Sequence, residues 1–110
     1  MSNPVNVIAQ AAPAAATLTD LYTVPALTQS AVGTFVACNQ NGSSVLVRVA
    51  IALAGAADTR KQYLYYDAVL PPNTTIELIS NMTLNTTDVV RVQTDTTNVS
   101  FNLFVVETIP

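Results

Sequence analysis

One stretch of the sequence, residues 44–55, constrains the fold more than any other because both of its faces are apolar. Residues two apart share one face of a β-strand. The odd positions here carry large aliphatic side chains: Val45, Val47, Val49, Ile51 and Leu53. The even positions carry a single charge, Arg48, and are otherwise apolar and mostly alanine. Because such a strand is rarely left in water on either side, we expect the odd face to build the core. The even face then needs a second sheet, an arm or a neighbouring subunit to cover it.

The composition also favours an assembly. Hydrophobic residues make up 50% of the 110 residues and charged residues only 10%, whereas typical soluble domains carry about 25% charged residues. So few charges leave neutral or apolar areas of the kind that mark interaction sites. A surface kept soluble by threonine and asparagine is the alternative interpretation. The length suits one domain.

From Leu18 onward the chain shows strand patterns and no helical period. Apolar or alternating runs between short turns predict seven strands, over residues 18–24, 31–39, 44–55, 62–70, 74–80, 88–94 and 99–107. Short strands at this spacing are typical of a sandwich or barrel, and their short connections require antiparallel order. We therefore predict an all-β fold, an antiparallel β-sandwich over residues 18–110, either immunoglobulin-like or jelly-roll.

Asn41 and Gly42 stand between two of the apolar runs. An Asn-Gly pair in this setting is a strong signal for a tight β-hairpin. The sequence thus predicts that residues 31–39 and 44–55 pair with each other.

Residues 1–17 differ from the rest of the chain. They contain no charge and two prolines, and Pro13 interrupts any helix that the alanines favour. We expect an extended N-terminal arm, in which Val5 and Val7 can add a short strand. A frayed terminus is the alternative.

The residue types needed for catalysis are scarce. The chain has no histidine and one cysteine, Cys38, so a histidine base, a Cys/His nucleophile pair and a zinc site lack their residues. The acidic residues are dispersed singly along the sequence. We expect a non-enzymatic protein with no cofactor and no metal. Because Cys38 lies in a predicted strand, we expect its thiol to be buried and inert.

The charge pattern argues against two classes of partner. The net charge is −3, and the only adjacent cations are Arg60 and Lys61, whereas nucleic-acid binding needs clustered cations. The sequence has no apolar run long enough to cross a bilayer and no recognisable signal peptide at its start. We expect no nucleic-acid or membrane partner and synthesis in a reducing cytoplasm.

Several segments in their order along the chain resemble a small β-sandwich found among the virion structural proteins of tailed bacteriophages. They are residues 21–26, 36–39, 45–52, 62–67, 88–92 and 98–101. The resemblance implies a capsid cement (decoration) protein of the virion, which binds the major capsid protein and copies of itself as a homo-oligomer. One alternative is a tail, neck or fibre-attachment component. The other is a carbohydrate-binding module that uses the tyrosines of residues 63–66.

The arm and the second faces of the strands supply the expected interface. The last strand resembles the central one, because Phe104 and Val106 make its second face apolar. The candidate interface residues are Val5, Val7, Ile8, Leu46, Arg48, Tyr66, Phe104 and Val106. As the only charge in its strand, Arg48 is expected to pair with Asp67, with Glu77 or with an acid of the partner.

Overall fold

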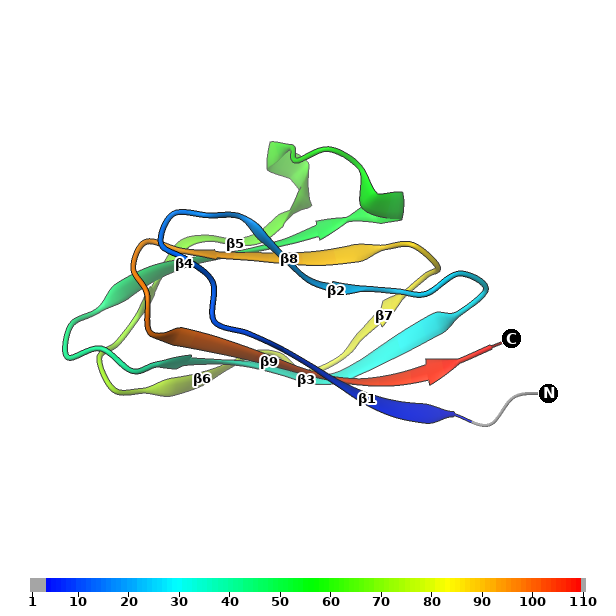
Figure 1. The fold of residues 1–110 in the computed structure, drawn as a ribbon, viewed down its shortest axis with the longest axis horizontal. Coiled ribbons are helices and arrows are strands. Elements are labelled where there is room, and N and C mark those ends of the chain that lie inside the picture. Colours follow the sequence, from blue (N-terminus) through cyan, green and yellow to red (C-terminus); the bar gives the residue numbers. More distant parts are fainter. Residues whose placement is uncertain (1–3, 110) are drawn as a thin grey trace.

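Two antiparallel sheets pack face to face in the computed structural model, which describes residues 4–109 (Figure 1). Sheet A has the strand order β1 (Val5–Ala11), β9 (Val99–Thr108), β3 (Gln29–Asn39) and β6 (Thr75–Ile79), and β7 (Met82–Leu84) also pairs with β3. Sheet B has the strand order β2 (Thr19–Thr23), β8 (Val89–Thr94), β4 (Val45–Ala52) and β5 (Tyr63–Leu70). The predicted antiparallel β-sandwich is confirmed.

The strand pairs are nested, and this decides between the two predicted topologies. β1 pairs with β9, β2 with β8, β3 with β6 and β7, and β4 with β5. The chain is thus paired like one long hairpin whose turn lies between β4 and β5. The hairpin is rolled up so that each of its two halves passes from one sheet to the other. This is the arrangement of a jelly roll.

The predicted hairpin at Asn41 and Gly42 is wrong, because β3 and β4 lie in different sheets. The turn crosses between the sheets, and the side chain of Asn39 holds it there. Its Nδ2 donates to the carbonyl oxygens of Ser43 (2.9 Å) and Leu70 (3.1 Å). The apolar runs on either side show that strands flank the turn, but they do not identify the partner of each strand.

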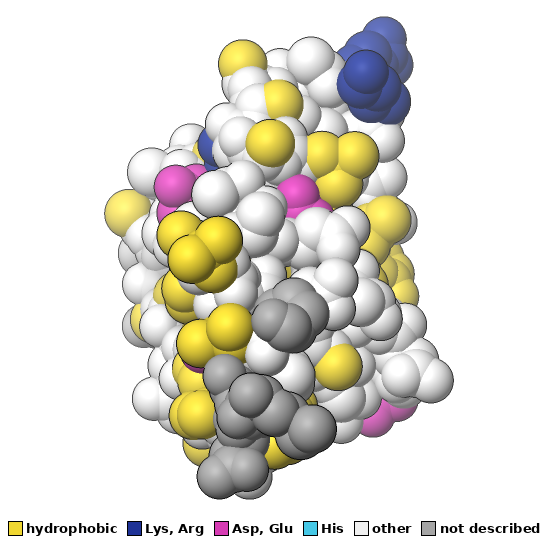
Figure 2. Space-filling view, turned by 90° about the vertical axis from the view of Figure 1, so that its right-hand side faces the viewer, with side chains coloured by type: hydrophobic (Ala, Val, Ile, Leu, Met, Phe, Trp, Pro, Cys, Tyr) yellow, Lys and Arg dark blue, Asp and Glu magenta, His cyan; other side chains and the backbone are white. Residues whose placement is uncertain are grey.

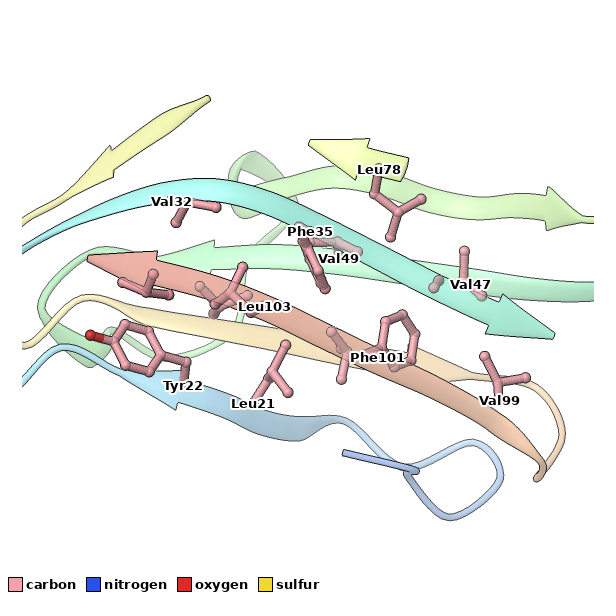
Figure 3. Close-up of a cluster of buried hydrophobic side chains, with 14 of the residues drawn as sticks. Leu21, Tyr22, Val32, Phe35, Val47, Val49, Leu78, Val99, Phe101 and Leu103 are labelled. Carbon is pink, nitrogen blue, oxygen red and sulfur yellow. The ribbon is translucent and has the colours of Figure 1, made fainter. Parts of the chain in front are cut away.

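The core lies between the sheets and takes the inward residues of both (Figure 3). The rings of Phe35 and Phe101, from β3 and β9, lie 6.0 Å apart between their centroids. From β4, Val47 and Val49 enter the same cluster, as the alternation predicts. Other fully buried members are Val24, Val32, Val45, Leu70, Leu84, Val90, Val92 and Leu103.

The alanine end of the second face of β4 is covered by the chain itself. Ala50 and Ala52 are fully buried, and the loop with the short 3₁₀ turns η1 (Leu53–Gly55) and η2 (Arg60–Gln62) lies above sheet B on this side (Figure 1). The expectation that an arm, a sheet or a neighbour covers this face is therefore wrong for the alanine end of the strand.

Arg91, on the adjacent strand β8, ties this loop down. Its Nη1 donates to the carbonyl oxygen of Ala56 at 2.8 Å, and its Nε donates to Asp20 Oδ1 at 2.9 Å. A guanidinium satisfied on both sides holds loop and sheet together through charge-assisted bonds.

Neither helical turn of the described residues is long enough to cross a membrane.

The N-terminal segment, expected as an extended arm over residues 1–17, contains β1. This strand pairs with β9 of the same chain over seven residue pairs, from Val5 opposite Glu107 to Ala11 opposite Phe101. The short strand predicted from Val5 and Val7 is therefore present, and it forms one edge of sheet A.

Val49→Asp is expected to prevent folding, because Val49 has no exposed surface. Burying an unpaired carboxylate costs several kcal/mol, a large part of the stability of about 5–15 kcal/mol that such a domain has. Circular dichroism and urea unfolding measure the effect. Leu46→Asp, on the outward face of the same strand, is the matched control and should cost about 1 kcal/mol or less. A folded Val49→Asp variant with a comparably small loss would contradict this assignment of the core face.

Candidate assembly surface

Three exposed apolar side chains, Ile8, Phe104 and Val106, lie together on the outer face of sheet A, and we call them the sheet A patch. Ile8 is directly opposite Phe104 in the β1–β9 ladder. Because Leu103 and Val105 point into the core, their neighbours in β9 must point outward. The exposed fractions are 58% for Ile8, 41% for Phe104 and 37% for Val106. Adjacent exposed side chains of this size indicate an interaction surface.

A hollow of about 320 Å³ opens on this patch. It is lined by residues of β1, β3 and β9, and the β3 contribution is Gly33, which has no side chain to fill it. A register shift in β3 between Val32 and Thr34 places this glycine next to Phe104. The hollow gives the otherwise flat patch a place to receive an apolar side chain of a partner.

The two sheets differ in charge. The strands of sheet A contain only two charged residues, Glu77 and Glu107, and no cation. The four cations of the chain belong to sheet B and its covering loop: Arg48, Arg60, Lys61 and Arg91. Viewed toward the chain ends, the cations lie in the upper part of the surface, whereas hydrophobic side chains occur over its whole height (Figure 2). The sheet A patch therefore loses little charge solvation when a partner covers it.

The edge strand β1 is unprotected. Exposed edges invite pairing with other chains, and natural proteins block them with charges, bulges or very short strands. Edge strand β2 carries Asp20 and a register shift, β5 carries a bulge, β6 carries Glu77, and β7 has three residues. β1 has seven uncharged residues in unbroken register. Of the edges in the described part of the chain, this one is open to another strand.

The outer face of sheet B carries a polar aromatic cluster centred on Arg48. Tyr66 and Asp67 both lie opposite this arginine, because the β4–β5 register shifts there and forms a bulge. The Arg48 Nε donates to Asp67 Oδ1 at 2.6 Å, and its Nη2 donates to Oδ2 at 3.2 Å. The guanidinium also lies 4.0 Å from the centroid of the Tyr66 ring, a cation–π contact. The predicted pairing of Arg48 with Asp67 is confirmed, whereas Glu77 lies in the other sheet.

The candidate interface residues divide between the two outer faces. Ile8, Phe104 and Val106 form the sheet A patch. Leu46, Arg48 and Tyr66 lie on sheet B, where Leu46 faces the exposed Val69. The remaining two, Val5 and Val7, lie at the start of β1. Val5 is exposed and lies opposite Glu107, whereas Val7 is half-buried and packs against the core. All eight remain predictions as contact residues.

Two features were not found from the sequence. The first is the open edge of β1. The sequence shows that this segment has no charge, but it does not show which strands lie at the edges of the sheets. The second feature is the direction of Val69 and Leu70. The bulge at Arg48 shifts the alternation of β5, and as a result Val69 points outward and Leu70 inward.

Cys38 also differs from expectation. Its side chain is half-buried rather than buried, and it lies on sheet A opposite Ser100 of β9 and Thr75 of β6. Within residues 4–109, no three metal-ligating side chains come together.

Comparison with known proteins identifies a similar fold. No protein-family model matches the chain, and no curated protein is significantly similar to it. A solved structure from Bacillus endospore appendages, which form a family of disulfide-linked pili, has a similar fold. The TM-score is 0.60 at 12% sequence identity, over 97% of this chain and 87% of that chain. At this identity the likeness establishes the fold.

The assignment to bacteriophage virion proteins is corrected by this comparison. The fold matches a pilus subunit of a spore appendage and not a capsid protein, so the interpretations as capsid cement and as a virion component are wrong. A major capsid protein as partner has no support. The segments that suggested the family are strands and turns, and such patterns occur in unrelated β-sandwiches.

The Arg48–Asp67 pair yields a prediction about pH. Hydrogen bonds from Arg48 hold the pKa of the Asp67 carboxyl below its usual value. Because this pKa is lowered on folding, the pair stabilises the protein above the unfolded pKa, and the stabilisation is lost as the pH falls through the folded value. NMR titration of the Asp67 carboxyl should show the low pKa in the parent and a normal one in Arg48→Met. An unchanged pKa in the variant would refute the pairing in solution.

Proposed function

We propose that this chain is a non-enzymatic structural subunit that assembles with copies of itself into a fibre. The observation that carries the proposal is the sheet A patch, Ile8, Phe104 and Val106, next to the uncharged edge of β1. The likeness in fold to a pilus subunit supports it. Of the interpretations drawn from the sequence, the alternative of a tail, neck or fibre-attachment component agrees with this likeness better than capsid cement does, although its virion location does not. The likeness also makes a spore surface the first place to look for the fibre.

Two unlike faces favour an open fibre over a closed dimer. A contact between two different surfaces repeats from subunit to subunit, and when the rotation does not close a ring it produces a filament. The sheet A patch is apolar, and the facing pair Leu46 and Val69 gives sheet B a smaller exposed apolar area of its own. In our proposal the sheet A patch of one copy contacts this pair on the next.

Disulfides cannot join such a fibre at every junction through this sequence. A covalent link on both sides of each subunit needs two cysteines, and the sequence has Cys38 alone. One thiol joins two copies at most. At least every second junction must therefore be stabilised without a disulfide, by apolar burial and strand pairing, unlike the disulfide-linked pili of the similar fold.

Phe104→Asp should abolish fibres while leaving a folded monomer. The substitution places a carboxylate in the centre of the sheet A patch, where a partner would have to bury it. Electron microscopy and sedimentation measure assembly, and circular dichroism and melting check the fold. Leu53→Asp, at a residue that is 67% exposed on the covering loop, is the matched control and should still assemble.

The same assay separates a fibre from a two-fold dimer. In the proposed fibre, Val69→Asp blocks assembly as Phe104→Asp does, because each contact uses both faces. If Phe104→Asp assembles like the parent, the proposed function is wrong. If only Phe104→Asp blocks assembly and the parent stops at dimers, the patch contacts itself and no fibre forms.

A further inference from the structure

β1 is attached to the sandwich along one side only. Within residues 4–109 it pairs with β9 alone, and each of its side chains is exposed or half-buried. The three that point toward the core are small and only partly covered: Val7, Ala9 and Ala11. Because the hydrophobic contribution scales with the apolar area buried, β1 is the strand whose release removes least from the core.

The strand that β1 pairs with stays in place without it. β9 is paired on its other side with β3, from Gln29 opposite Thr108 to Asn39 opposite Val99. The far end of β9 is fixed by Tyr22, whose hydroxyl donates to Glu107 Oε2 at 2.5 Å. Burial, together with the bond to Glu107, raises the pKa of Tyr22 to about 12, so the phenol remains a hydrogen-bond donor in alkaline solution as well as at neutral pH. An emptied β9 edge would therefore remain ready to pair with a strand.

The connection between β1 and β2 is suited to open. It contains Pro13, which restricts its own φ and favours an extended residue before it. It also contains Ala16 at φ 55°, a left-handed conformation that is strained for an alanine. Straightening the connection relieves that strain and breaks the bond that the Ala16 N–H donates to the carbonyl oxygen of Thr94 (2.7 Å). Fully extended, residues 12–18 span about 23 Å at ~3.3 Å each, comparable with the 20 Å of the thinnest dimension of the molecule.

We propose that β1 is exchanged between copies: in the assembled protein it leaves its own β9 and pairs, in the same register, with the β9 of a second copy. A second copy is the occupant because it supplies the same seven residue pairs, so the exchange restores the strand pairing that the release removes. A released β1 is uncharged and mostly apolar, which also favours renewed pairing over exposure to water. The proposal rests on the proposed self-assembly and adds how the copies are joined.

A pair of engineered cysteines distinguishes a retained strand from an exchanged one. Gln10 and Asn102 face each other across β1 and β9, and their side chains form a hydrogen bond of 2.7 Å. In Gln10→Cys/Asn102→Cys, with Cys38→Ser to remove the native thiol, the protein is assembled under reduction and then oxidised. Exchange predicts covalent multimers on a non-reducing gel. Assembled protein with only intrachain disulfides would overturn it.

A matched variant places the disulfide across strands that do not exchange. Cys38 lies opposite Ser100 in the β3–β9 ladder, so Ser100→Cys should give an intrachain disulfide in both monomer and assembly. Oxidised first as dilute monomers, the β1–β9 variant should lose assembly until it is reduced, whereas the β3–β9 variant should assemble in either state. Assembly of the β1–β9 variant while its disulfide is closed would refute the exchange of β1 but not the proposed fibre function. If the parent and both reduced variants stay monomeric, the proposed fibre function fails as well.

Discussion

The pairing of β9 with β3 is the interaction on which the rest of the structure depends. Its register turns Phe101 and Leu103 of β9 into the core, and the same alternation turns Phe104 outward. A slip by one residue would exchange the two sets, exposing the core residues and burying the patch. The core and the proposed assembly surface are therefore set together by one ladder, and β1 attaches to the outer edge that this ladder presents.

Local sequence patterns predicted those features of the fold that depend on a single strand or on two neighbouring strands. The alternation in β4 identified Val47 and Val49 as core residues, and the lone charge of that strand identified Asp67 as one of three candidate partners for Arg48. The sheet to which each strand belongs depends on contacts between distant segments, which alternation does not record. For this reason the turn at Asn41 was misassigned as a hairpin, since its sequence fits a tight turn whether or not the flanking strands pair.

Function was harder to predict than fold for a related reason. The segments that resembled phage virion proteins are strands and turns, which specify a β-sandwich but not its partners. The scarcity of charge and the two apolar faces of the central strand pointed to assembly, and the candidate residues Ile8, Phe104 and Val106 do lie together. Tyr66 and Leu46, from the same prediction, lie on the opposite sheet. The sequence indicated exposed apolar side chains without showing that they lie on the outer faces of two different sheets.

The contrast among the sheet edges gives the strongest physical reason to place assembly at β1. A monomeric protein gains from blocking every edge, and here β2, β5 and β6 are blocked by charge or by irregular register. Leaving seven uncharged residues in regular register beside an apolar patch would expose such a protein to aggregation. The same arrangement is useful when the strand and the patch are meant to meet another copy, because pairing there is then directed to one edge and away from the others.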